Sequence, residues 1–170
     1  AYKGIWISKY LKKFPNLVAY LIEPHENSFM FLEEKFKNFE NISLFKIGLS
    51  NSNEIQKVNI NTKSYTNSFL EFDKDVSKSW KYEQFENLYK EEVKMQKLTD
   101  FVQENNIPRI NVLKLDVQGY ESRVLNGAIN LLKDNLVDLI LLEVIIIPTY
   151  ENQSRVSEIF NIFDSYDYSL

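Results

Sequence analysis

The sequence that most clearly indicates the fold is residues 112–121, which read VLKLDVQGYE. The aliphatic and β-branched residues at its start are typical of a buried strand, which ends abruptly at Asp116. In open α/β sheets the ligand crevice lies outside the carboxyl ends of the strands. A carboxylate there is costly to desolvate and adds nothing to packing. We therefore expect Asp116 to meet a ligand or a reacting group, the alternative being a strand-end residue hydrogen-bonded to a loop.

Apolar runs and amphipathic segments alternate along the rest of the chain. Buried strands are predicted at residues 17–22, 42–47, 110–117 and 137–147, and helices at 4–14, 27–36, 98–105, 121–133 and 157–166. This alternation predicts an α/β fold with a mostly parallel sheet and helices on both faces. Glu23, Gly48, Asp116 and Glu143 are then expected at one edge of the sheet.

The remaining segments are less regular. Residues 55–61 alternate like a half-exposed strand, whereas residues 63–97 scatter aromatic side chains among charged ones. This second segment is predicted to be a loop with a helix near residues 82–91 and a short strand at 93–95. Because binding residues gather on loops above a rigid sheet, it is the expected cover of a substrate site.

Composition limits the classes of protein to which the chain can belong. The 170 residues, 44% of them hydrophobic, favour one domain over residues 1–170, and the net charge of −4 argues against nucleic-acid binding. The absence of cysteine excludes a disulfide and a thiolate metal site, and one histidine excludes a multi-histidine site. No apolar run reaches the roughly 20 residues that span a bilayer. The first residues do not resemble a signal peptide, so we expect a cytoplasmic protein, with its true start upstream of Ala1.

Three carboxylates besides Asp116 are candidates for chemistry. Glu23 ends an apolar run roughly 20 residues after Gly4, a spacing at which a carboxylate binds ribose in nucleotide-binding α/β folds. Glu121 is expected in the first turn of a helix, after a glycine that permits a positive φ. Glu143 interrupts the most hydrophobic strand and is expected to face Asp116. Two facing carboxylates could share a proton, stabilise a cation or bind a metal, although no motif supports a metal.

Several segments together resemble the FkbM family of S-adenosylmethionine (SAM)-dependent methyltransferases over almost the whole chain. They are YLIEPH (20–25), LFKIGLS (44–50), TNSF (66–69), LTDF (98–101), LDVQGYE (115–121), LNGA (125–128) and LEV (142–144). Residues 1–6, AYKGIW, are similar to the end of the family's glycine-rich SAM loop. The resemblance therefore implies a fragment that lacks the first strand and the last strands of a Rossmann-like class I methyltransferase fold.

The resemblance also implies a cofactor and its contacts. SAM would be bound with its ribose at Glu23, its methionine portion along the backbone of Tyr2 and Gly4, and its adenine near Gly48 and Ser50. Asp116 would lie beside the methionine end and the transferred methyl group.

The reaction implied is methyl transfer, usually to an oxygen of a sugar or another small hydroxyl-bearing metabolite. Asp116 or Glu143 would take the hydroxyl proton. The residues expected to meet the substrate are Asn67, Ser68, Gln118 and Glu121.

Two other functions fit part of the sequence. A nicotinamide-dependent oxidoreductase would share Glu23 and the parallel sheet. That function does not predict the 116–121 segment, and the chain has no Tyr-x-x-x-Lys motif for hydride transfer. A non-catalytic glycan-binding or scaffold domain with a degenerate cofactor loop is the second alternative.

Overall fold

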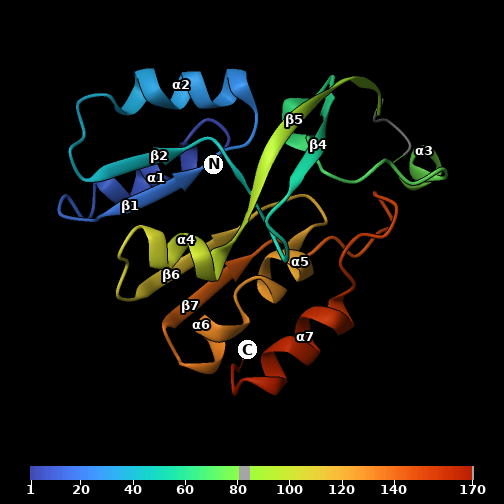
Figure 1. Ribbon diagram of the computed structural model, residues 1–170. Helices are drawn as coiled ribbons and strands as arrows, with labels where there is room; N and C mark the ends of the chain where they lie inside the picture. Colours follow the sequence, from blue (N-terminus) through green and yellow to red (C-terminus); the bar gives the residue numbers. More distant parts are fainter. Residues whose placement is uncertain (81–84, 170) are drawn as a thin grey trace. The chain divides into compact units, whose positions relative to one another are not determined.

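The computed structural model describes residues 1–80 and 85–169, which form two compact units, residues 1–48 and 49–170 (Figure 1). Each unit is described by itself. The expectation of a single domain over residues 1–170 stays a prediction.

The first unit is a parallel strand pair with two helices. Its elements are α1 (Ile5–Leu11), β1 (Ala19–Ile22), α2 (Glu26–Phe36) and β2 (Ile42–Phe45). Strand β1 pairs in parallel with β2, with Ala19 opposite Ile42 and Ile22 opposite Phe45. The helices and strands of this unit pack around one apolar cluster, formed by Ile7, Ala19, Leu21, Leu32 and Phe36. The predicted order of helix, strand, helix and strand is thus confirmed.

Gly4 lies where α1 begins and allows close packing within this unit. Its φ is +63°, in the left-handed region, and a Cβ at this position would lie 2.6 Å from the Phe36 ring. Only glycine combines this backbone conformation with this close approach.

The second unit begins with a three-stranded sheet in the order β3-β5-β4. Its strands are β3 (Gly48–Ser50), β4 (Ile55–Asn61) and β5 (Asn87–Lys97), and β4 pairs antiparallel with β5. The helix expected near residues 82–91 is wrong for Asn87–Glu91, which belong to β5; residues 81–84 lie outside the described part. The strand forms because β4 supplies its backbone hydrogen-bond partners, with Glu91 opposite Val58. Short helices η1 (Ser64–Thr66) and α3 (Val76–Ser79) occupy the connection.

The rest of the second unit contains a parallel pair and four helices. Strand β6 (Ile110–Leu115) pairs with β7 (Val137–Leu142), accompanied by α4 (Leu98–Glu104), α5 (Glu121–Asn126), α6 (Ile129–Lys133) and α7 (Val156–Ser165). The strand predicted to reach residue 147 ends at Leu142 and is not buried on both faces, since Leu139 is 49% exposed. The described residues therefore form an α/β structure with short parallel pairs and a three-stranded sheet that includes the antiparallel β4–β5 pair.

The predicted helix 121–133 is divided at Gly127, where several elements meet. The Gly127 carbonyl accepts hydrogen bonds from the Thr99 backbone N–H (3.1 Å) and from the Thr99 hydroxyl (3.0 Å). A Cβ at Gly127 would lie only 2.0 Å from the Ser50 carbonyl oxygen. The close contact with β3 thus requires a residue without a side chain.

We expect Gly127→Ala to destabilise the full-length protein by roughly 1–3 kcal/mol, because the obstructing atom belongs to the backbone and cannot rotate away. Urea denaturation would measure the change. Lys133→Ala, at the exposed end of α6, is the control and should stay within about 0.5 kcal/mol of the wild type. Equal midpoints for Gly127→Ala and the wild type would contradict the packing role.

Candidate functional site

In the second unit, two carboxyl groups lie at the same edge of the β6–β7 pair. Asp116 follows Leu115 and Glu143 follows Leu142, and these two leucines are opposite each other in the parallel register. The Glu143 backbone N–H donates to the Leu115 carbonyl at 3.0 Å. Glu143 therefore lies beside Asp116, as expected, and it follows the strand that it was expected to interrupt.

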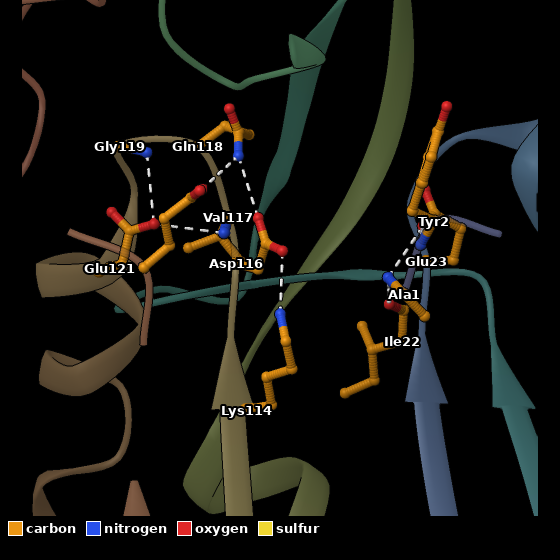
Figure 2. A network of polar contacts seen from close by, with 11 residues as sticks. Ala1, Tyr2, Ile22, Glu23, Lys114, Asp116, Val117, Gln118, Gly119 and Glu121 are labelled. Atoms are coloured by element: carbon orange, nitrogen blue, oxygen red, sulfur yellow. Dashed lines mark hydrogen bonds and ion pairs between the residues drawn. The ribbon is translucent and has the colours of Figure 1, made fainter. Parts of the chain in front are cut away.

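The Gln118 amide connects the two carboxyl groups. Its Nε2 donates to Asp116 Oδ1 at 3.0 Å and to Glu143 Oε2 at 2.8 Å. On its other oxygen, Asp116 forms an ion pair with Lys114 Nζ at 2.9 Å (Figure 2). The Asp116 side chain is still 48% exposed, so a small molecule can reach it.

The surroundings shift the pKa values of the two carboxyl groups in opposite directions. Partial burial raises the pKa of Asp116, but the Lys114 ammonium and hydrogen bonds from Gln118 and Glu143 outweigh it and leave the pKa below its usual range. Partial burial, followed by repulsion from Asp116 and a hydrogen bond to it, raises the pKa of Glu143. Because the groups titrate as a pair, Asp116 is ionised first and Glu143 keeps the proton to higher pH.

Glu121 holds the loop that joins β6 to α5. Its side chain is buried, with 2% of the residue exposed, and Oε1 accepts from the backbone N–H groups of Val117 (3.2 Å) and Gly119 (3.4 Å) (Figure 2). Gln118 and Gly119 have φ angles of +51° and +90°, so the expected turn at Gly119 is confirmed. Burial raises the pKa of Glu121 despite these hydrogen bonds. The geometry supports a loop-holding role, and contact with substrate stays a prediction.

The predicted substrate residues Asn67 and Ser68 are engaged with other parts of the chain. The Ser68 hydroxyl donates to the Gln118 carbonyl at 2.7 Å, and Asn67 Oδ1 accepts from the Asn61 backbone N–H at 2.9 Å. Ser68 therefore supports the same loop as Glu121. Tyr150 belongs to this network as well, since its hydroxyl lies 3.1 Å from Gln118 Oε1. Nothing in its local sequence pattern marks it.

Glu23 lies in the first unit, directly after β1, and is 7% exposed. Its Oε2 accepts from the Tyr2 backbone N–H at 2.6 Å and from the Ala1 backbone nitrogen at 2.9 Å (Figure 2). Its Oε1 accepts from the His25 backbone N–H at 3.2 Å. The carboxylate thus binds the backbone of the segment before Gly4 to the end of β1, while Oε1 retains the capacity to accept another donor. Its ribose role stays a prediction.

Gly48 and Ser50, the predicted neighbours of adenine, bound the short strand β3. Ser50 is fully buried, and its hydroxyl donates to Asn51 Oδ1 at 3.1 Å. Its side chain is therefore engaged within the protein, and contact with adenine stays a prediction for both residues.

Residues 1–80 and 85–169 contain no group of three or more histidine, cysteine or acidic side chains arranged to hold a metal ion. Within the same ranges, no helix combines the length and apolar character needed to cross a bilayer.

The role of Glu121 can be tested with two substitutions. Glu121→Gln keeps an acceptor for both loop N–H groups and removes the buried charge, whereas Glu121→Ala leaves both donors unpaired and should cost about 1–3 kcal/mol. A carboxyl whose pKa is raised on folding contributes stability below its unfolded pKa, and this is lost as pH rises through the folded pKa. Glu121→Gln should therefore reduce the decline in stability between pH 4 and 7, as measured by urea denaturation. Equal destabilisation by both substitutions would refute the loop-holding role.

Comparison with known proteins assigns the chain to a family. The methyltransferase FkbM domain matches residues 1–170. No curated protein and no solved structure matches the chain. Since the domain match covers every residue, the resemblance seen in the sequence is confirmed, and the protein belongs to the FkbM methyltransferase family.

Proposed function

We propose that the protein is a SAM-dependent O-methyltransferase acting on a hydroxyl group of a sugar or another small metabolite. We also propose that its strands belong to a Rossmann-like class I sheet that is mostly parallel and covered by helices on both faces. The observation that carries the proposal is the unequal pair of Asp116 and Glu143 at the carboxyl ends of β6 and β7. In α/β folds this is the edge of the sheet where ligands bind.

The residues present fit the cofactor that the family usually uses. Ribose recognition needs a carboxylate that can accept hydroxyl hydrogens, and Glu23 Oε1 has that capacity beyond its bond from His25. An ionised, half-exposed Asp116 suits a ligand with positive charge. When bound, SAM supplies an electrophilic methyl group.

Asp116 is suited to orient the acceptor hydroxyl and receive its proton. A carboxylate with a lowered pKa is too weak a base to deprotonate a free alcohol. It is strong enough once the oxygen begins to gain the methyl group, because the developing oxonium is far more acidic. Lys114 and Gln118 keep Asp116 ionised before the transfer, and alignment of the hydroxyl supplies much of the remaining rate.

The acceptor is proposed to be small and uncharged or cationic. Asp116 and Glu143 are exposed at the site, and Lys114 is already paired with Asp116. The chain carries a net charge of −4, which disfavours a nucleic-acid acceptor.

The ribose role predicts that Glu23→Ala weakens SAM binding to the full-length protein at least tenfold, because the loss of a hydrogen bond to a charged group costs about 1.5–3 kcal/mol. Isothermal titration calorimetry would measure it. Glu40→Ala removes an exposed carboxylate from the same unit and should leave the affinity unchanged. Equal affinities for Glu23→Ala and the wild type would refute the ribose role.

The proton role predicts that Asp116→Asn lowers kcat by roughly a hundredfold or more, since the amide cannot take the proton. The assay would offer a panel of hydroxylated metabolites and detect the mass of one added methyl group. Asp134→Asn, in an exposed turn after α6, is the control. Methyl transfer to a nitrogen or carbon atom, or full activity of Asp116→Asn, would contradict the proposal.

A further inference from the structure

We infer that Tyr150 is a positioning residue: its hydroxyl fixes the orientation of the Gln118 amide, and through that amide it controls how Asp116 and Glu143 share a proton. The geometry stands by itself, while its effect on rate rests on the proposed function.

The Tyr150 hydroxyl is held at one place inside the second unit. The residue is 2% exposed, and its ring stacks on that of Phe72, with centroids 5.4 Å apart and planes inclined by 18°. Its backbone N–H donates to Gln153 Oε1 at 3.0 Å. The ring and the backbone are therefore both anchored, so the hydroxyl has little freedom to leave its partners.

Two acceptors lie within reach of this one hydroxyl hydrogen. They are Gln118 Oε1 at 3.1 Å and the Thr66 carbonyl at 2.9 Å. The Thr66 carbonyl already accepts from Asn61 Nδ2 at 2.7 Å, so it does not depend on Tyr150. Gln118 Oε1, by contrast, accepts from no donor other than Tyr150 within residues 1–80 and 85–169. We therefore expect the Tyr150 hydroxyl to donate its hydrogen to Gln118 Oε1.

That hydrogen bond selects one of two orientations of the Gln118 amide. With Oε1 toward Tyr150, Nε2 directs its hydrogens at Asp116 and Glu143, and both contacts are attractive. After a half-turn, Oε1 would face two carboxyl groups, at least one of them ionised. Burial, followed by repulsion from Glu143, Glu121 and Asp116, raises the pKa of Tyr150, so the hydroxyl remains a donor throughout the working pH range.

The consequence for the carboxyl pair follows from the groups that face it. These are Lys114 from β6, Asp116 after it, Glu121 at the start of α5, Glu143 after β7, and Tyr150. The Gln118 hydrogen bond favours the ionised form of both carboxyl groups. A Gln118 amide that turns freely gives up part of this effect, so both groups should bind protons more readily.

The test is Tyr150→Phe in the full-length protein, with kcat/KM measured against pH. The acidic limb of the pH profile of kcat/KM should move to higher pH by roughly half to one pH unit, while SAM affinity stays unchanged. This shift corresponds to the free energy of one neutral hydrogen bond. Tyr168→Phe is the matched control, since it removes a tyrosine hydrogen bond (2.6 Å to the Val137 carbonyl) away from the carboxyl pair. It should lose stability without moving the limb.

A second variant separates positioning from packing. Gln118→Met removes the amide without disturbing the stacked rings and should move the limb at least as far as Tyr150→Phe does. The double variant should move it no further, because Tyr150 acts through Gln118. If the two shifts add, or if Tyr150→Phe leaves the limb in place, the inference is wrong.

A readout without catalysis distinguishes this inference from the proposed function. Carboxyl NMR titrations of Asp116 and Glu143 should both shift to higher pH in Tyr150→Phe and in Gln118→Met. Such shifts in a protein that transfers no methyl group would leave the inference standing and refute the proposed function. Unchanged titrations in a protein that does transfer a methyl group would refute the inference and leave the proposed function standing.

Discussion

The pairing of β6 with β7 brings two carboxyl groups to one sheet edge, where the repulsion between them must be relieved. The surrounding side chains relieve it unevenly. Lys114 forms an ion pair with Asp116 at 2.9 Å, whereas Glu143 faces the Asp116 anion. The pKa of Asp116 is therefore lowered and that of Glu143 raised, which gives two identical functional groups different properties.

The loop between β6 and α5 shows how much the sequence predicts. A strand that ends at a carboxylate, a positive φ at Gly119 and a helix that begins at Glu121 follow from residue type and spacing alone. The partners of these residues do not, because Ser68 and Tyr150 reach Gln118 from distant parts of the chain. No periodicity within residues 112–121 encodes either contact.

The wrong predictions have the same origin. The polar start of β5 reads as helix or loop until β4 is known to pair with it, and the need for glycine between α5 and α6 comes from the Ser50 carbonyl oxygen opposite Gly127. In both places a segment remote in sequence acts on the local structure. Glu23 is a milder case: its position after β1 was predictable, but its bonds to the Tyr2 and His25 backbone were not. Membership of the FkbM methyltransferase family removes the nicotinamide alternative, which shared only Glu23 and the sheet.

The left-handed conformation of Gln118 has a consequence for how the loop responds to change. A residue other than glycine in this region stores free energy, which is maintained only because Glu121, Ser68 and Tyr150 each constrain a different atom of the loop. Loss of one constraint weakens the hold on this conformation, and loss of two weakens it further. The backbone of this loop therefore owes its shape partly to residues that lie far from it in the sequence.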